Sequence, residues 1–113
     1  MVKSTYIPER GDIVWLDLNP SKGHEQKGAR PALVISPKLY NAKTDLALVC
    51  PITSVAKGYS FEVELHAKET FGVVLADHIR SIDWKFRNVR FLETVSPAVM
   101  DEVEARLKAL IVH

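Results

Sequence analysis

Six short apolar runs separated by polar turns limit the possible folds of this chain more than any other feature of its sequence. Alternating or continuous apolar residues, rich in β-branched and aromatic types, are typical of strands. Because no crossover helix lies between the runs, they predict a small antiparallel sheet or barrel. The predicted strands span residues 12–18, 31–37, 46–53, 61–65, 72–82 and 89–95.

Two prolines carry positional information within these runs. Pro31 cannot donate a ladder hydrogen bond, so it is expected at the first position of its strand. Pro51 suggests that the strand 46–53 lies at an edge or carries a bulge, and either would redirect the residues that follow. Residues 39–45 and 83–88 are expected to form helical turns or loops.

The last segment is expected to be an amphipathic helix. Ser96 can cap its start, and Pro97 suits the first helical position. The polar side is acidic rather than basic, so the helix is expected to pack on the barrel and not on a membrane. Apolar residues recur at helical spacing at Val99, Val103, Leu107, Leu110 and Ile111.

Length and composition indicate a single water-soluble domain over residues 1–113. No stretch has the apolar length of a signal peptide or a membrane helix, so we expect a cytoplasmic protein without a membrane partner. The single cysteine, Cys50, lies in an apolar run, and a buried hydrophobic role is expected for it.

The charge balance excludes one broad class of partner. Residues 1–90 carry 13 Lys and Arg against 10 Asp and Glu, whereas residues 91–113 carry 2 against 4. This bias is far weaker than the basic face of a general nucleic-acid binder. Any polyanion must therefore be held by a few well-placed groups.

Familiar cofactor motifs are absent from the sequence. No pair of histidines has metal-ligand spacing, and no cysteine cluster accompanies them. Neither a phosphate-binding glycine motif nor the GxSxG nucleophile elbow occurs. We therefore expect no metal and no cofactor. The histidines are His24, His66, His78 and His113.

The junction between a polar loop and an apolar strand is the strongest candidate for chemistry. The loop, residues 20–30, is longer than an ordinary hairpin connection. Arg30 ends it, and its planar fork of donors suits a phosphate, although a surface arginine at a strand end is the simpler explanation. The loop adds cations, a titratable ring and a carboxylate at Lys22, His24, Glu25, Gln26 and Lys27.

Polar residues also follow two later strands. Thr53 and Ser54 end the strand 46–53, and Lys57 lies shortly after them. Hydroxyls at strand ends usually bond to their own backbone, which is the simpler explanation here. A second polar turn holds Asp77, His78 and Arg80, where a capped turn or a surface ion pair would suffice.

Together these segments match a known pattern. GDIVWLDLNPSKGHEQKGARPALVIS, then PITS, KGYSFEVEL and GVVLADHIRSIDW, closely resemble the MazF/PemK family of toxins from bacterial toxin-antitoxin pairs. The resemblance covers almost the whole chain in order. The segment E-Q-x-G-x-R-P-A-L-V, followed by P-x-T, is highly specific.

The resemblance implies a fold and an activity. The fold is a five- to seven-stranded SH3-like barrel with a C-terminal helix, and members form homodimers. They cleave single-stranded RNA at short motifs without a metal, which leaves a 2′,3′-cyclic phosphate and a 5′-hydroxyl. A cognate MazE-like antitoxin lays a disordered acidic tail over the active site of each toxin.

The resemblance also assigns residues. The family's catalytic arginine falls on Arg30 and its catalytic threonine on Thr53, whereas His78 replaces a more usual glutamine. The general base stays open among Glu25, His24 and His78, with Glu25 preferred. The residues expected to bind RNA are Lys22, His24, Gln26, Lys27, Ser54, Lys57, Tyr59, Asp77, His78 and Arg80.

Two alternatives share the expected fold. One is a CcdB-like gyrase poison that cuts no RNA, and the other is a degenerate member that only binds its antitoxin. The pair Arg30 and Thr53 favours the nuclease, because both belong to the catalytic motif.

Overall fold

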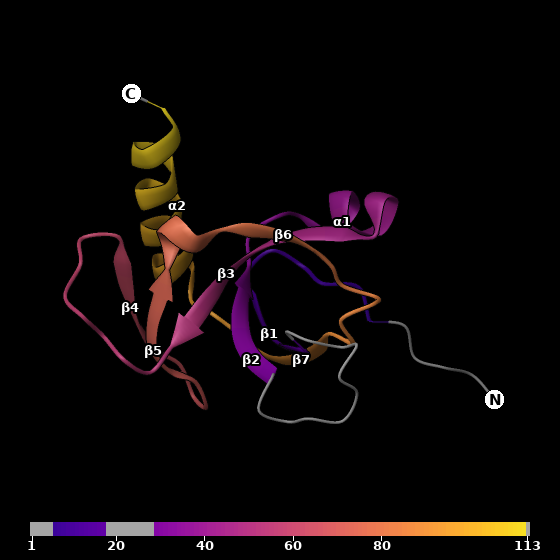
Figure 1. Cartoon of the computed structure of the whole chain (residues 1–113), viewed down its shortest axis with the longest axis horizontal. Coiled ribbons are helices and arrows are strands. Elements are labelled where there is room, and N and C mark those ends of the chain that lie inside the picture. The colour runs from indigo at the N-terminus through magenta and orange to yellow at the C-terminus, as the bar shows by residue number, and fades with distance from the viewer. Residues whose placement is uncertain (1–5, 18–28, 113) are drawn as a thin grey trace.

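A curled antiparallel sheet of seven strands forms the body of the protein (Figure 1). The computed structural model describes residues 6–17 and 29–112. The sheet and the C-terminal helix confirm the predicted fold class. The strands are β1 (Asp12–Asp17), β2 (Ala29–Val34), β3 (Leu46–Thr53), β4 (Glu62–His66), β5 (Phe71–Leu75), β6 (Arg80–Asp83) and β7 (Arg90–Thr94). The helices are α1 (Lys38–Thr44), the short 3-10 helix η3 (Ala76–His78) and α2 (Pro97–Ile111).

Strand β3 is the centre of the sheet and has three strand partners. It pairs with β2 along one side, through Ala32↔Pro51, Leu33↔Cys50 and Val34↔Val49. Along its other side it pairs first with β6, over Leu46–Val49, and then with β5, at Ile52 and Thr53. The order through the sheet is β4-β5-β3-β2-β1-β7, with β6 attached to β3.

The positions of both prolines differ from the sequence predictions. Pro51 lies in this central strand and not at an edge, at the point where the second partner changes from β6 to β5. Pro51 pairs with Ala32 of β2, but neither β6 nor β5 pairs with it on the other side of β3. Its missing N–H therefore costs no ladder bond on that side. Pro31 is the third residue of β2, opposite Trp15, but β3 joins β2 only from Ala32 onward.

The predicted strand 72–82 is divided into β5, η3 and β6. Both strands run antiparallel to β3 on the same side. Between the pairs Ile52↔Val74 and Val49↔Arg80, β3 advances three residues while its partner advances six. The surplus residues form η3, which explains why the apolar run turns polar at this point.

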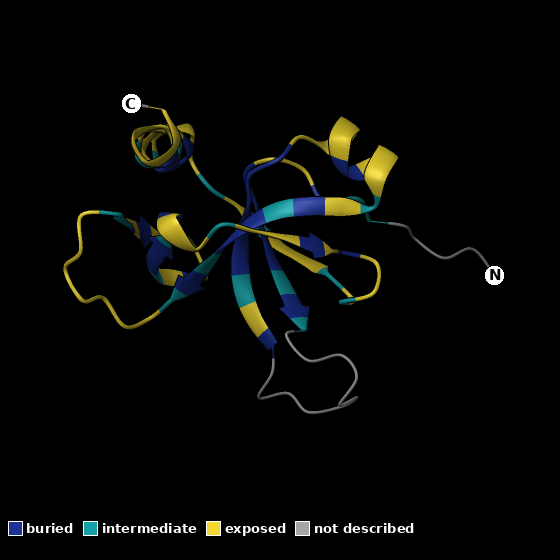
Figure 2. Cartoon of the chain, turned by 45° about the horizontal axis from the view of Figure 1, so that its top comes forward, coloured by how far each residue is buried: buried dark blue, intermediate teal, exposed yellow. Residues whose placement is uncertain are grey.

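Both faces of the central strands are buried, because a separate core covers each (Figure 2). Ile13 and Leu33 point into the first core, and their chain neighbours Val14 and Val34 point into the second. This alternation explains why the central strands read as continuous apolar runs. The first core contains Ile13, Leu33, Ile35, Cys50, Ile52, Val63, Leu65, Val74, Ala76, Met100, Val103 and Leu107. The second contains Val14, Leu16, Ala32, Val34, Ala47, Val49, Ile82 and Trp84.

Helix α2 covers the first core as predicted, but its apolar stripe is shifted. The Ser96 hydroxyl accepts a hydrogen bond from the Val99 N–H, and this caps the helix. Met100 is buried together with the predicted Val103 and Leu107. Leu110 and Ile111 are exposed, because the sheet that the helix packs against does not extend beneath its last turn. In the described part of the chain, no helix is long and apolar enough to cross a membrane.

Asn41 in α1 is a buried polar hub for three segments. Its side-chain amide donates to the carbonyls of Pro8, at 2.7 Å, and Ser36, at 3.1 Å. Its side-chain oxygen accepts from the Ser36 hydroxyl at 2.6 Å. Its backbone carbonyl accepts from the Trp84 indole at 3.0 Å. The hub therefore ties the N-terminal segment and the turn after β6 to α1.

Removing this hub should destabilise the fold strongly. Asn41→Ala leaves buried carbonyls without their donor, and we expect the free energy of unfolding to fall by about 2–4 kcal/mol. Urea denaturation measures this change. Lys43→Ala, at an exposed position of the same helix, is the control and should stay within about 0.5 kcal/mol of wild type. Equal losses in the two variants would contradict the role of the hub.

Candidate functional site

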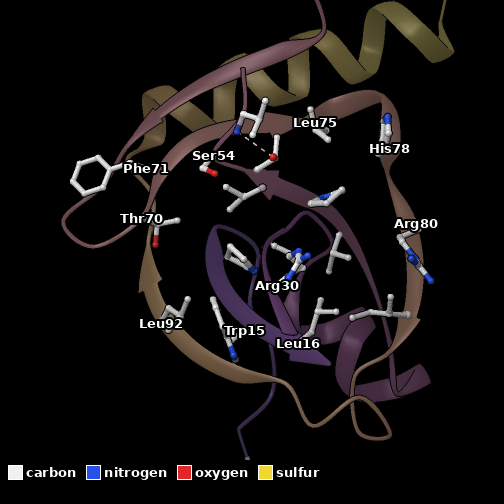
Figure 3. A pocket seen from close by; sticks show the side chains of 18 of the residues that line it. Trp15, Leu16, Arg30, Ser54, Thr70, Phe71, Leu75, His78, Arg80 and Leu92 are labelled. Carbon is white, nitrogen blue, oxygen red and sulfur yellow. Dashed lines mark hydrogen bonds between the residues drawn. The ribbon is translucent and has the colours of Figure 1, made fainter. Parts of the chain in front are cut away.

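A cavity of about 900 Å³ opens over the second face of the sheet, where β2 begins and β3 ends (Figure 3). Arg30 lies at the centre of the view in Figure 3, with His78 and Arg80 on one side and Thr70 and Leu92 on the other. The predicted site residues that line the cavity are Arg30, Thr53, Ser54, His78 and Arg80.

The register of the sheet places Arg30 and Thr53 on the same face. Residues directly opposite each other in antiparallel strands point the same way, and this repeats every second residue. The pair Ala32↔Pro51 is the last one between β2 and β3. Two residues further along each strand come Arg30 and Thr53. Both therefore project from the face that the cavity covers.

Arg30 is held by the strand that carries it. Its backbone pairs with Leu16 of β1, so the guanidinium starts from a fixed strand position. One Nη donates to the carbonyl of Ala29 at 3.0 Å, which bends the side chain back along the strand end. A guanidinium that is fixed at its base and open to a cavity can bind a phosphate in a bidentate manner.

Thr53 has the local hydrogen bond that strand-end hydroxyls usually make. Its Oγ1 accepts from the Val55 N–H at 3.2 Å. This bond orients the hydroxyl but uses only a lone pair, so the O–H proton can still be donated to a ligand. Thr53 can therefore make its local backbone hydrogen bond and bind a ligand at the same time.

Gly72 allows β5 to approach the end of β3 closely. Its φ is +135°, a conformation that side-chain-bearing residues rarely adopt. A Cβ at this position would lie 2.2 Å from the carbonyl oxygen of Thr53 and 3.1 Å from the Cα of Ser54. The placement of both hydroxyl residues therefore depends on a glycine in the neighbouring strand.

His78 and Arg80 form one wall of the cavity. Arg80 lies opposite Val49 in the sheet and so shares the face of the second core. His78 precedes it at the end of η3, with its Nε2 3.6 Å from a carboxylate oxygen of Asp77. Asp77 itself does not line the cavity. The structure therefore brings together two of the three polar residues predicted in this turn.

An aromatic stack connects the loop 54–60 to this wall. The Tyr59 and Phe61 rings are 5.3 Å apart and nearly parallel, and Phe61 lies 6.5 Å from the His78 ring. The backbone N–H groups of Lys57 and Gly58 donate to the Glu62 carboxylate, which fixes the loop. The predicted residues Lys57 and Tyr59 thus lie beside the cavity and do not line it.

The opposite wall contains residues that the sequence analysis missed. Glu69 and Thr70 of the β4–β5 turn and Phe71, the first residue of β5, line the cavity there. Glu93 of β7 accepts hydrogen bonds from the Lys68 and Glu69 N–H groups and from the Thr70 hydroxyl. The only sequence signal was an acidic residue next to the apolar pair Phe91 and Leu92 in the predicted strand.

The Glu93 carboxyl has a lowered pKa. Partial burial alone would raise it, but the hydrogen bonds from the Thr70 hydroxyl and from the backbone of the β4–β5 turn outweigh that effect. Cys50 shows the opposite behaviour, because burial and then the nearby Asp77 charge raise the pKa of its thiol to about 12. Cys50 is buried as predicted.

The remaining predicted residues lie outside the described part of the chain. They are Lys22, His24, Glu25, Gln26 and Lys27. Asp17 and Ala29, the residues that flank this loop, form a pair in the sheet. Among residues 6–17 and 29–112, no three His, Cys, Asp or Glu side chains form a group that could hold a metal ion.

Fold and site together define a small curled-sheet protein with an arginine and a threonine hydroxyl in one open cavity, an arrangement suited to phosphate groups. Residues 9–111 match the family described as PemK-like, MazF-like toxin of type II toxin-antitoxin system, and the chain belongs to this family.

Relatives of known activity and structure agree with this assignment. The chain is 45% identical to the endoribonuclease toxin MazF of Escherichia coli K12 over 108 residues, which cover 96% of this chain and 97% of that protein. It is 41% identical to the Escherichia coli endoribonuclease PemK, over 91% of this chain and 81% of that protein. A MazE-MazF crystal structure from Deinococcus radiodurans superposes with a TM-score of 0.86 at 45% identity, and covers 96% of this chain and 98% of that one.

Adding a side chain at Gly72 should disturb the end of β3, because there is no room for a Cβ atom there. We expect Gly72→Ala to lower the free energy of unfolding by about 3 kcal/mol or more, since backbone strain and a clash with Thr53 add together. Gly58→Ala is the matched control. Its φ is also positive, at +80°, but nothing lies within 4 Å of the added Cβ, so strain alone should cost about 1 kcal/mol. Similar losses in urea denaturation would contradict the close approach.

The lowered pKa of Glu93 should make its contribution to stability depend on pH. Because the folded pKa lies below the unfolded value, this contribution is present above the unfolded pKa and is lost as pH falls through the folded one. The stability difference between wild type and Glu93→Gln should therefore shrink from about pH 6 to about pH 3. Urea denaturation over this range measures it. A difference that does not change with pH would contradict the assignment.

Proposed function

We propose that this chain is a toxin that cleaves single-stranded messenger RNA at specific sequences without a metal, and so blocks translation and growth. The observation that carries the proposal is the placement of Arg30 and Thr53 on one sheet face, inside one cavity. The endoribonuclease activity of the relatives MazF and PemK supports it.

The chemistry requires three tasks at one phosphate. The ribose 2′-oxygen loses its proton and attacks phosphorus, negative charge accumulates on the phosphorane, and the 5′-oxygen leaves with a proton. The products are a 2′,3′-cyclic phosphate and a 5′-hydroxyl. Arg30 stabilises the charge through its guanidinium, and Thr53 orients a phosphate oxygen through its O–H.

The general base is assigned to Glu25, with His24 and His78 as the other candidates. Arg30 is a poor base because a guanidinium keeps its proton at neutral pH. Glu25 is the carboxylate nearest to Arg30 in sequence. His78 lines the cavity, beside Asp77.

Base recognition is assigned to the rim of the cavity. Unpaired bases are held by stacking on aromatic or guanidinium faces and are read at their edges by hydrogen bonds. Tyr59 presents an exposed ring at the end of the aromatic stack, and Ser54 and Arg80 supply donors from the walls. Lys57, Asp77 and the loop residues Lys22, His24, Gln26 and Lys27 complete the proposed RNA-binding set.

Two protein partners belong to the proposal. A second copy of the chain would form the homodimer that the resemblance implies. A MazE-like antitoxin would be the other partner, since the Deinococcus radiodurans relative crystallised as a MazE-MazF complex, and its tail would cover the cavity as the resemblance implies. An acidic antitoxin tail would be attracted to the same cations as RNA. We expect the toxin to act in the cytoplasm, because messenger RNA is its proposed substrate.

The gyrase-poison alternative receives no support. The relatives reported above are endoribonucleases. Purified protein incubated with a long RNA in EDTA separates the two functions. Fragments with 5′-hydroxyl ends support the nuclease, whereas intact RNA together with inhibited gyrase supports the poison.

Substitutions in the pair should slow cleavage strongly. Arg30→Ala should lower kcat by about 100- to 1000-fold, and Thr53→Val should act in the same direction, because each removes a donor to the transition state. Arg30→Lys keeps the charge but loses the planar fork, so it should restore only part of the rate. Lys108→Ala, an exposed change on α2, is the control and should cleave like wild type. Cleavage by Arg30→Ala at the wild-type rate would refute the assignment.

A further inference from the structure

Glu93 connects two parts of the sheet that the strand order keeps far apart. It lies in β7, at one end of the order β4-β5-β3-β2-β1-β7, whereas the β4–β5 turn belongs to the other end. Its carboxylate accepts from the N–H groups of Lys68, at 3.1 Å, and Glu69, at 3.0 Å, and from the Thr70 hydroxyl, at 2.7 Å. The Glu93 carboxylate thus links the two ends of the curled sheet.

The segment that Glu93 holds is a wall of the cavity. Glu69, Thr70 and Phe71 all line it. In Figure 3, Thr70 and Leu92, the residue before Glu93, lie next to each other on the side of the cavity away from His78 and Arg80. The ring of Phe71 is exposed beside them. A base that enters the cavity from this side would meet the turn first.

The contact requires a carboxylate. Three donors converge on two oxygens, and two of them are consecutive backbone N–H groups, an arrangement that favours an anion. A glutamine has the same length, but only one of its two terminal atoms can accept, so at least one of the three donors loses its partner and the negative charge is lost as well. Glu93→Gln therefore weakens the contact with little change in volume.

We infer that Glu93 is a positioning residue for RNA binding: by tying the β4–β5 turn to β7, it fixes the wall against which an unpaired base is held. The inference rests on the function proposed above. It assigns Glu93 an effect on substrate binding and none on the chemical step. The reacting pair Arg30 and Thr53 is placed by strands β2 and β3, whose register does not involve the turn.

Electrostatics alone predicts the opposite result. Removal of a negative charge near a phosphate-binding cavity should tighten the binding of RNA and lower KM. Release of the wall should instead raise KM. The direction of the change in KM therefore distinguishes positioning from charge, and Glu64→Gln provides the charge control, because Glu64 is an exposed residue of β4.

The experiment compares wild type, Glu93→Gln, Thr70→Val and Glu64→Gln. Steady-state cleavage of a single-stranded RNA oligonucleotide that contains a mapped cleavage site gives KM and kcat. We expect KM to rise about tenfold in Glu93→Gln, and less in Thr70→Val, which loses one of the three donors. We expect kcat to stay within about twofold. Glu64→Gln should leave KM unchanged or lower it.

Amide hydrogen exchange of the free proteins tests the contact itself. The N–H groups of Lys68 and Glu69 should be protected in wild type and exchange faster in Glu93→Gln, while the amides of β3 stay protected. This readout does not depend on catalysis. It also shows whether the variant is folded. If Glu93→Gln loses protection throughout the chain, the kinetic test is made with Thr70→Val instead.

The outcomes separate the inference from the proposed function. Faster exchange in the turn together with a raised KM and an unchanged kcat supports the inference. An unchanged or lowered KM in Glu93→Gln, or a fall in kcat alone, overturns it. A wild-type protein that protects the two amides but leaves RNA intact refutes the proposed function instead, and the contact then has a structural role only.

Discussion

The pairing of β3 with three other strands is the constraint on which the rest of the structure depends. β2 lies along one side of β3, and β6 and β5 share the other. The change of partner occurs at Pro51, whose missing N–H makes it suitable for the gap. Two residues later β3 ends at Thr53, so the position of this hydroxyl follows from the pairing of the whole sheet. The same register brings Arg30 to the same face.

The cavity is therefore assembled from strand ends that different interactions hold. The β2–β3 register sets the positions of Arg30 and Thr53, which serve the chemistry in the proposed mechanism. The close approach at Gly72 fixes the neighbouring strand against Thr53. Hydrogen bonds to the Glu93 carboxylate set the position of the far wall. This separation allows substrate binding to change without a change in the reacting groups.

Sequence patterns were accurate where local physics decided the outcome. The bounds of β3 were predicted correctly because both of its faces are buried, which makes the whole strand an apolar run. The Ser96 cap and Pro97 located the start of α2. Predictions were wrong where contacts with another segment determine the position of a residue. Pro51 is in the central strand, Pro31 lies within its strand, and Leu110 and Ile111 are exposed beyond the sheet.

The sequence by itself determined the antiparallel class, the C-terminal helix and the motif that contains Arg30 and Thr53, because hydrophobic periodicity, capping residues and motif spacing are local properties of the chain. Only the tertiary structure decided which residues complete the cavity. Gly72, Thr70 and Glu93 acquire their roles from contacts between segments about 20 or more residues apart in the sequence. Sequence spacing does not encode such contacts, because the curl of the sheet brings its ends together only after the strands have paired.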